Sequence, residues 1–301
     1  MMNNERQAWL DQRKKGIGGS DIAPMLGLSK WRSAYQLYLD KRGELPEQDD
    51  SEAMYWGREL EPVIRNRYEM ETGYTVTQED IITDPVYPFM LANIDGRIDK
   101  NRILEIKTAR TGDGWGEVNS AEIPLAYSLQ CQWYLGRTGA AVCDVAVLIG
   151  GSDFRLYQIK EDIDLQRMLE TAAIEFWDRV THGEPPDVVT YEDATERYGR
   201  ASAAGDVWAT EEVFDAWQEL KEVRLDIKHY EEKEEQLKAQ LCKFMADNYD
   251  TIVDPDGKPI ATWKLAKGTS RFDSKAFEKA HPDLYNQFKT TGEPSRRLLI
   301  K

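Results

Sequence analysis

Apolar and polar residues alternate along two short stretches near the middle of the chain, residues 93–99 and 103–108. Because side chains on a strand point alternately to opposite faces, this pattern predicts a β-hairpin. The apolar stretches Val142–Ile149 and Phe154–Lys160 predict two more strands. Apolar residues at helical spacing predict three helices, over 57–71, 121–136 and 163–181. The pattern therefore predicts an α/β core, in which helices flank a mixed central sheet built on the strands of 76–108 and their partners.

The last third of the chain follows a different pattern, which begins after Gly183-Glu184-Pro185-Pro186. Polar and small residues predict a linker over 187–210, and the chain from Glu211 to about Asn248 is predicted to form one long helix. Apolar positions recur along this helix at spacings close to multiples of 3.5 residues, at Val213, Trp217, Leu220, Ile227, Leu237, Leu241 and Phe244. Charged residues interrupt this stripe at Arg224, Glu231 and Glu234. Such a stripe is typical of a short coiled coil or of a helix docked on its own chain, and docking is the favoured interpretation.

Beyond the long helix, residues 251–264 predict a hairpin with an Asp256-Gly257 turn. Residues 258–301 hold ten Lys and Arg against four Asp and Glu, a net charge of +6, and aromatic residues are interleaved among them. This composition suits contact with nucleic acid, and it equally suits a small packed module with a solvated basic face. The chain is thus predicted to divide into a domain of residues 1–186, the linker, and a C-terminal α+β module over 211–301.

The second strand of the first hairpin carries two charged candidate site residues, Glu105 and Lys107. They are two residues apart, so on a strand their side chains point to the same face, while their neighbours are apolar. Asp95, at the start of the other strand, brings a second carboxylate to the hairpin. Two carboxylates and an ammonium on a strand fit for burial are costly unless they are compensated, and a divalent cation such as Mg²⁺ or Mn²⁺ would compensate them. This arrangement is the core of the nuclease fold written PD-(D/E)xK, and a solvated charged face is the alternative.

Two of the predicted helices carry further polar candidates. Glu61 lies four residues before Arg65, so it forms either a surface ion pair or an additional carboxylate near the hairpin. Gln130 and Tyr134 share one face of a helix that is otherwise mostly apolar. A buried glutamine needs partners for both ends of its amide, which are supplied either within the core or by a phosphate, a metal-bound water or the lysine.

The N-terminal segment from Trp9 to Gly27 is basic and runs into a glycine-rich turn, where Ser20 or Asp21 is predicted to cap a short helix. Backbone amides at such a turn form an anion site, to which Arg13 can add a bidentate contact.

Five segments carrying these residues follow one another along the chain: Gly-Ile-Gly-Gly-Ser-Asp-Ile-Ala at 16–23, Trp-Gly-Arg-Glu-Leu-Glu at 56–61, Ile-Asp-Gly at 94–96, Leu-Glu-Ile-Lys-Thr at 104–108 and Gln-Cys-Gln-Trp-Tyr at 130–134. Together they resemble the YqaJ-type viral recombinase family, whose best-known relative is lambda exonuclease. The resemblance covers residues 9 to about 185, and it departs from the family at Ile94, where a proline usually precedes the aspartate.

The resemblance implies a PD-(D/E)xK restriction-endonuclease-like fold and a Mg²⁺-dependent exonuclease. Such an enzyme resects linear double-stranded DNA in the 5′-to-3′ direction by two-metal phosphodiester hydrolysis, in phage-type recombination by single-strand annealing. By the same resemblance, Asp95 and Glu105 would bind the metals together with the main-chain carbonyl of Ile106. Glu61 would reach the second metal ion, and Lys107 would orient or activate the attacking water.

The other roles implied by the resemblance concern the DNA end and the partners. Gln130 would match the glutamine of the motif helix, with Gln132 as a rival, and Arg13 and Ser20 would hold the 5′ phosphate. The family further implies a RecT/Beta-like single-strand annealing protein as partner. It also implies a homo-oligomer, for example a trimeric ring.

Composition adds few constraints. The three cysteines have no metal-ligand spacing, which indicates a reducing compartment without a disulfide framework. The chain has neither a run of about 18 apolar residues nor an apolar signal core, so we expect a cytoplasmic protein. The resemblance further implies a bacterial host cytoplasm and a gene carried by a phage or prophage. A net charge of −15 argues against a strong static DNA binder, but a local basic channel on an acidic body remains compatible with a nuclease.

Two rival functions use the same residues. An endonuclease of the same fold would also cut closed circles, and a DNA-binding recombination scaffold would carry a degenerate site. The intact set of Asp95, Glu105 and Lys107 argues against degeneracy. Because the sequence has no helix-turn-helix, zinc-finger or P-loop pattern, it indicates neither a transcription factor nor an ATP-driven motor.

Overall fold

The computed structural model describes residues 12–45, 51–202, 205–292 and 294–301. The chain forms two compact units, Met1–Arg197 and Tyr198–Lys301. Trp9, which opens the predicted N-terminal motif, lies outside the described residues together with Leu10 and Asp11.

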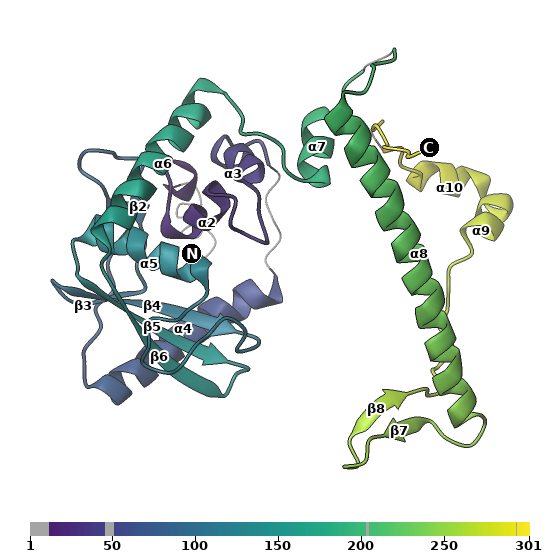
Figure 1. Ribbon diagram of the computed structural model, residues 1–301, viewed down its shortest axis with the longest axis horizontal. Coiled ribbons are helices and arrows are strands. Elements are labelled where there is room, and N and C mark those ends of the chain that lie inside the picture. Colours follow the sequence, from purple (N-terminus) through teal and green to yellow (C-terminus); the bar gives the residue numbers. More distant parts are fainter. Residues whose placement is uncertain (1–11, 46–50, 203–204, 293) are drawn as a thin grey trace. The chain divides into compact units, whose positions relative to one another are not determined.

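The first unit is built around a four-stranded sheet with the order β3-β4-β5-β6 (Figure 1). Its strands are β3 (Gly96–Asp99), β4 (Arg102–Ala109), β5 (Val142–Ile149) and β6 (Asp153–Lys160). β4 and β5 are parallel, whereas β3 pairs with β4 and β6 pairs with β5 in the antiparallel sense. The sheet is therefore mixed, and the predicted α/β architecture is confirmed. Strands β1 (Ile82–Thr83) and β2 (Leu91–Ala92) form a separate pair.

Helices cover both faces of the four-stranded sheet (Figure 1). Helix α4 (Glu52–Thr72) packs on one face against β4 and β5, and α5 (Leu125–Thr138) packs on the other. Beyond α5 lie the remaining elements of this layer, namely the 3₁₀ turn η1 (Gly19–Asp21), α2 (Ile22–Met25), α3 (Ala34–Lys41) and α6 (Ile163–His182).

Two of the predicted helices begin elsewhere than the pattern indicated. Helix α4 begins at Glu52 rather than at residue 57, because the Ser51 side chain accepts a hydrogen bond from the Met54 amide (3.2 Å) and so caps the helix. It ends at Thr72, one residue past the predicted range, and its C-cap Gly73 has a φ of 73°, a left-handed conformation that glycine adopts at no steric cost. Helix α5 begins at Leu125 rather than at residue 121, directly after Pro124.

Alternation along the strands separates two cores. Side chains such as Ile103, Val145 and Tyr157 join the large core beneath α5. The intervening residues, among them Leu104 and Ile106, pack against α4 in a smaller core. Because the period is two, this alternation directs the side chains of residues 105 and 107 toward the α5 face.

The predicted linker over 187–210 contains helix α7 (Tyr191–Tyr198). Asp193 of this helix is fully buried and accepts a hydrogen bond from the Ser33 hydroxyl (2.7 Å). The first unit therefore extends to Arg197, past the predicted boundary at residue 186. Residues 203 and 204 of the same segment lie outside the described part of the chain.

The second unit consists of α8 (Glu211–Met245), β7 (Thr251–Val253), β8 (Pro259–Thr262), α9 (Ser274–Ala280) and α10 (Pro282–Phe288). The predicted hairpin is confirmed, with Gly257 at a φ of 82° in its turn. Helix α8 is capped by Thr210, and Met245 is its single buried residue. The stripe of α8 is thus not covered by the rest of its own unit, and docking on the chain's own body stays a prediction.

The basic tail also lacks a core, since none of the described residues of 258–301 is buried. The packed-module interpretation of this tail is therefore not supported. Across the described ranges, no helix is both long enough and apolar enough to cross a membrane.

Candidate functional site

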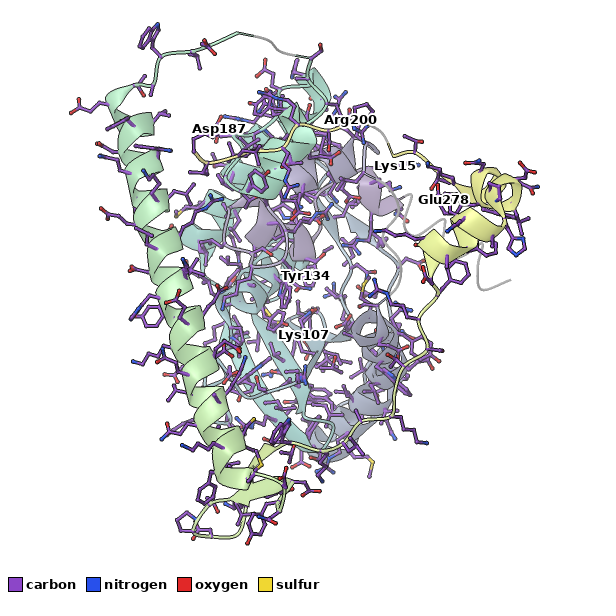
Figure 2. The ribbon with its side chains drawn as sticks, turned by 90° about the vertical axis from the view of Figure 1, so that its right-hand side faces the viewer. Lys15, Lys107, Tyr134, Asp187, Arg200 and Glu278 are labelled. Carbon is purple, nitrogen blue, oxygen red and sulfur yellow. The ribbon has the colours of Figure 1, made fainter. Side chains whose placement is uncertain are left out.

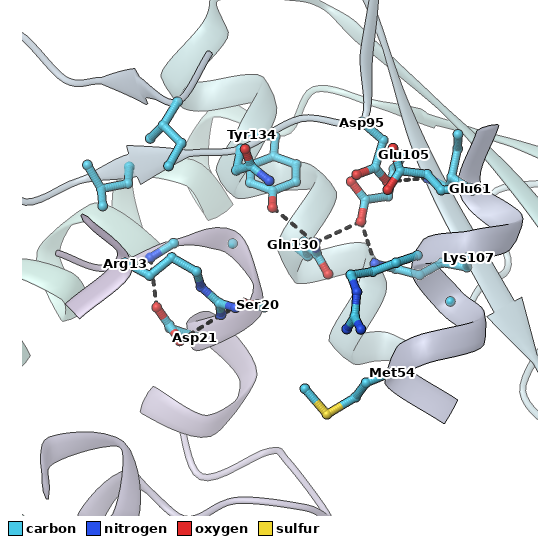
Figure 3. A pocket seen from close by; sticks show the side chains of 18 of the residues that line it. Arg13, Ser20, Asp21, Met54, Glu61, Asp95, Glu105, Lys107, Gln130 and Tyr134 are labelled. Carbon is cyan, nitrogen blue, oxygen red and sulfur yellow. Dashed lines mark hydrogen bonds and ion pairs between the residues drawn. The ribbon is translucent and has the colours of Figure 1, made fainter. Parts of the chain in front are cut away.

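A cavity of about 600 Å³ opens beside β4. The residues predicted for the site all line it: Arg13, Ser20, Glu61, Asp95, Glu105, Ile106, Lys107 and Gln130. Figure 3 shows them as two groups, with the carboxylates and Lys107 on one side and Arg13 with Ser20 on the other. Lys107 and Tyr134, which also lines the cavity, are labelled within the first unit in Figure 2. The fold thus brings together residues that are more than 100 positions apart in the sequence.

The short length of β3 creates the opening for Asp95. Pairing between β3 and β4 ends at Leu104, so the backbone of Ile106 has no strand neighbour on that side. Its amide donates instead to Asp95 Oδ2 (2.7 Å). The amide and carbonyl of one strand residue point to the same side, so the Ile106 carbonyl also faces this edge. The Ile106 side chain is packed in the smaller core, which leaves its main chain to line the cavity.

Glu105 is the most deeply buried carboxylate of the cavity, with 1% of its surface exposed. Its Oε1 accepts hydrogen bonds from Lys107 Nζ and from Gln130 Nε2, the latter at 2.7 Å. Its Oε2 is buried and has no hydrogen-bond partner. Burial, followed by the charge of Asp95, raises the pKa of Glu105 from 4.5 to about 8, despite the ion pair with Lys107. Burial also raises the pKa of Asp95.

Lys107 lies between these carboxylates and an aromatic ring. Its ammonium forms an ion pair with Glu105 and lies 5.0 Å from the centre of the Tyr127 ring. Burial alone would lower the pKa of Lys107, but the charges of Glu105 and Asp95 outweigh burial and raise it. The ammonium therefore stays charged in the cavity at neutral pH.

Glu61 combines the two interpretations that the sequence left open. It forms an ion pair with Arg65 one helical turn away, and it also lines the cavity. Arg65 Nη2 donates in addition to the Asp95 carbonyl (3.1 Å), which ties α4 to the start of β3. Burial and the charge of Asp95 raise the pKa of Glu61 despite Arg65.

The two glutamines of α5 have different environments. Gln130 bonds to Glu105 and donates to the Tyr134 hydroxyl (3.1 Å), in agreement with the shared helix face. Gln132 donates to the Lys160 carbonyl (2.7 Å) and accepts from the Asp162 amide (2.9 Å), so it joins α5 to the β6–α6 connection. Gln130, and not Gln132, is among the residues that line the cavity.

A buried ion pair supports the Arg13 side of the cavity. Lys41 Nζ donates to Asp21 Oδ2 (2.6 Å) and to the Arg13 carbonyl (2.9 Å). Arg13 Nη2 in turn donates to the Ser20 hydroxyl (2.8 Å). Burial would raise the pKa of Asp21, but the charges of Lys41 and Arg13 hold it below 3.8. These contacts fix where Arg13 and Ser20 face the cavity.

Asp21, one of the two predicted capping residues, is the N-cap residue of α2. Its side chain makes no capping hydrogen bond to that helix. The Asp21 carboxylate instead accepts from the Gly18 amide (2.9 Å) and closes the turn η1. Glycine at position 19 allows the backbone of this turn to pack directly against the Tyr134 ring, because a Cβ on Gly19 would lie 2.5 Å from that ring.

Replacing Lys41 with methionine is expected to lower the free energy of unfolding by about 3–5 kcal/mol, because Asp21 would remain buried without its counter-ion. Urea denaturation at pH 7 measures this change. The exposed neighbour Lys15 provides the control, since Lys15→Met should change stability by less than about 0.5 kcal/mol. In the unaltered protein the depressed pKa of Asp21 stabilises the fold above pH 3.8, and this contribution is lost as the pH falls further. A loss for Lys41→Met as small as that of the control would refute the ion pair's role.

The donor set of the cavity fits a hard divalent cation. Within the described ranges, no three His, Cys, Asp or Glu side chains gather closely enough to form a metal centre by themselves. However, Glu105 Oε2 is buried without a partner, and the charge of Asp95 raises the pKa of both Glu61 and Glu105. Both features indicate missing positive charge, and oxygen donors are those that Mg²⁺ and Mn²⁺ prefer. The residues present are therefore compatible with the expected metal.

Residues 8–141 match the sequence profile of the YqaJ-like viral recombinase domain. The chain is 34% identical over 295 residues to the protein YqaJ of Bacillus subtilis (strain 168), an alignment that covers 94% of this chain and 91% of YqaJ. The chain belongs to the YqaJ-like viral recombinase family. A shorter similarity, 31% identity over 80 residues, relates 27% of this family member to 23% of protein D345L of African swine fever virus.

Among solved structures, this YqaJ-like chain is similar to the alkaline exonuclease LHK-Exo of Laribacter hongkongensis. The identity is 23% and the TM-score 0.49, with 59% of this chain and 94% of that chain covered. A phage related exonuclease from Haemophilus somnus gives 11% identity and a TM-score of 0.41, covering 56% of this chain and 96% of that one.

Two charged residues of the site were not predicted from the sequence of this YqaJ-like protein. Lys41 shares the apolar face of α3 with Leu37 and Tyr38, and a lysine on such a face is the signal that indicates a buried partner. The sequence indicates Arg65 only as the ion-pair partner of Glu61. Its second contact, to the Asp95 carbonyl, depends on how α4 crosses the hairpin.

Proposed function

We propose that this chain is a metal-dependent deoxyribonuclease that resects linear double-stranded DNA from the 5′ end. The observation that carries the proposal is the buried and unpartnered Glu105 Oε2, which lies in one cavity with Asp95 and Lys107. Such an arrangement is costly in a protein that only binds DNA, since each buried charge must be compensated. Membership of a viral recombinase family supports the same substrate.

Asp95, Glu105 and the Ile106 carbonyl would hold Mg²⁺ or Mn²⁺, and Glu61 would contribute to a second ion. The bound ions would lower the pKa of water and stabilise charge on the phosphate oxygens. Lys107, which stays protonated, acts as a hydrogen-bond donor that orients the attacking water through Nζ. Gln130 Nε2 holds Glu105 Oε1, so that the free Oε2 remains directed at the site.

Arg13 and Ser20 are proposed to bind the 5′ phosphate of the strand that is degraded. A guanidinium and a hydroxyl 2.8 Å apart offer adjacent donors to a phosphate, and the Asp21–Lys41 pair positions both. Recognition of the terminal phosphate at one side of the cavity and hydrolysis at the other would produce 5′-to-3′ exonuclease activity on DNA ends. In phage-type recombination the remaining strand would pass to a RecT/Beta-like single-strand annealing protein, and the enzyme would act as a homo-oligomer such as a trimeric ring.

Digestion of three DNA substrates in Mg²⁺ tests the proposal. The substrates are a linear duplex with a 5′ phosphate, the same duplex without it, and a closed circle of the same sequence. We expect release of mononucleotides, fastest from the phosphorylated duplex, while the circle stays intact. Arg13→Ala should remove most of the preference for the phosphorylated end, because the guanidinium supplies the charge-assisted contact.

The same experiment separates the alternative functions. Cleavage of the closed circle would identify an endonuclease of the same fold. Absence of Glu105-dependent hydrolysis in both Mg²⁺ and Mn²⁺ would leave a DNA-binding recombination scaffold as the function.

A further inference from the structure

Helix α8 carries a largely apolar face that its own unit leaves uncovered. Positions spaced alternately by three and four residues form this face, which we call the α8 seam: Val213, Ala216, Leu220, Val223, Ile227, Tyr230, Glu234, Leu237, Leu241 and Phe244. All ten are exposed, including Ile227 at 51% and Leu237 at 52%. Glu234 is the single charged residue among them. This spacing is that of a coiled coil, in which the seam faces a second helix.

The α8 seam differs from the stripe recognised in the sequence. That stripe passes through Trp217 and then meets Arg224 and Glu231, whereas the α8 seam passes through Val223 and Tyr230 and avoids both charges. The helix has 35 residues and is about 50 Å long, since each residue adds about 1.5 Å. An exposed apolar face of this length indicates an interaction surface.

We propose that α8 pairs with α8 of a second copy of this chain in an antiparallel coiled coil. In the fully overlapping antiparallel register, each half of the α8 seam meets the other half on the partner. Leu220 lies opposite Leu237 of the partner subunit, and Ile227 lies opposite Tyr230 of the partner subunit. Val213 lies opposite Phe244 of the partner subunit at the ends.

The charges beside the α8 seam select the antiparallel direction. In an antiparallel pair, Arg224 faces Glu231 of the partner subunit, and Asp226 faces Lys233 of the partner subunit. Each contact occurs twice by symmetry, so four opposite-charge pairs flank the helices. Arg224 of the partner subunit also comes beside Glu234, the charged position of the α8 seam.

A parallel pair of the same helices would bring like charges together. Asp226 would face Glu231 of the partner subunit, and Lys233 would face Lys238 of the partner subunit. Only the contact of Glu219 with Arg224 of the partner subunit would be attractive. The antiparallel dimer is therefore the arrangement that this sequence favours, and it is independent of the proposed nuclease chemistry.

Disulfide cross-linking of the full chain tests the pairing. Cys242 is partly exposed on α8, whereas Cys131 and Cys143 are buried, so the variants are made in a Cys242→Ser background. Leu220→Cys and Leu237→Cys are prepared separately and then mixed under mild oxidation. We expect a disulfide-linked dimer from the mixture and none from either variant alone, because in the antiparallel pair equal positions lie about 25 Å apart.

A matched control uses the outward face of the same helix. Gln218 and Ala239 also lie level with each other in the antiparallel register, but on the face opposite to the α8 seam, so Gln218→Cys mixed with Ala239→Cys should remain unlinked. Cross-linking of each seam variant by itself would overturn the proposal in favour of a parallel pair. Equal linkage of the control would show random collision. Absence of any linkage would show that something other than a second copy covers the α8 seam.

Charge reversal provides a second test, read by sedimentation equilibrium of the full chain. Arg224→Glu should weaken association through α8 by about tenfold, since attractive contacts become repulsive on both sides of the dimer. Adding Glu231→Arg should restore it, because the exchanged charges again face each other. Failure of the second change to restore association would overturn the antiparallel register.

Discussion

Replacing Glu105 with glutamine is expected to lower the rate of DNA hydrolysis by about a thousandfold or more, and at the same time to stabilise the metal-free protein. The two effects have one cause. Glu105 is almost fully buried, one of its oxygens has no partner, and its pKa is raised to about 8. A neutral amide of the same shape removes the buried charge, and it also removes an anionic ligand for the metal. A catalytic carboxylate thus differs from a structural one in the sign of its effect on stability.

The pH dependence of stability provides a readout that does not depend on activity. An acid whose pKa is higher in the folded than in the unfolded state binds more protons when folded, so folding is favoured at low pH. For Glu105 this contribution is present below pH 4.5 and is lost as the pH rises toward about 8. Metal-free wild-type protein should therefore lose stability over this range, whereas Glu105→Gln should lose less. Mg²⁺ should stabilise the wild type more than the variant, since a ligand that binds only the folded state raises the free energy of unfolding.

Asp144 on the neighbouring strand is the matched control. It is also a buried carboxylate, but Tyr68, Arg102 and Gln158 all donate to it, and it lies outside the cavity. Asp144→Asn should therefore reduce stability and leave hydrolysis unchanged, which is the reverse of Glu105→Gln. Thermal unfolding with and without Mg²⁺, combined with a linear-duplex digestion assay, distinguishes the two. If Glu105→Gln hydrolysed DNA at a rate close to that of the wild type, Glu105 would not be a metal ligand.

The sheet and the carboxylate side of the cavity could be predicted because their determinants are local. A period of two places Glu105 and Lys107 on one face of β4. The short hairpin between β3 and β4 brings Asp95 next to these two residues. The same reasoning separated Gln130, on the face of Tyr134, from its apolar neighbours. For these residues, spacing along a single element is sufficient to define their direction.

The remaining features depend on contacts between distant segments. Helix α7 has a polar sequence and was predicted as part of a linker, and Asp193 anchors it through Ser33, 160 positions away. Lys41 could not be assigned to Asp21 from the sequence, because the contact requires the particular packing of α3 on the N-terminal turn. From the sequence, the Asp21 side chain can either cap α2 or close the turn before it. The ammonium of Lys41 favours the turn-closing conformation, in which Asp21 accepts from the Gly18 amide.

Replacing Lys107 with methionine is expected to lower turnover by about 10²–10⁴-fold while DNA binding changes little. The methionine side chain fills nearly the same volume, so the apolar contacts of β4 are retained. What is lost is the ammonium that bonds to Glu105 Oε1 and lies beside Asp95. Single-turnover hydrolysis at saturating DNA in Mg²⁺ measures the chemical step, and fluorescence anisotropy with labelled duplex measures binding.

Loss of the ammonium also changes the pKa of the neighbouring carboxyl group of Glu105. Without Lys107, the pKa of Glu105 should rise further, because burial and Asp95 would act on it unopposed. In the metal-free protein, the fall in stability with rising pH should therefore extend to higher pH in Lys107→Met. Lys107→Arg keeps a positive charge, and it should restore this pH dependence of stability without restoring the rate of hydrolysis, since a planar guanidinium cannot occupy the place of a compact ammonium between Glu105 and the Tyr127 ring. Parallel losses of binding and turnover in Lys107→Met, with an unchanged pH dependence of stability, would instead assign Lys107 to DNA contact and leave the orientation of water to another residue.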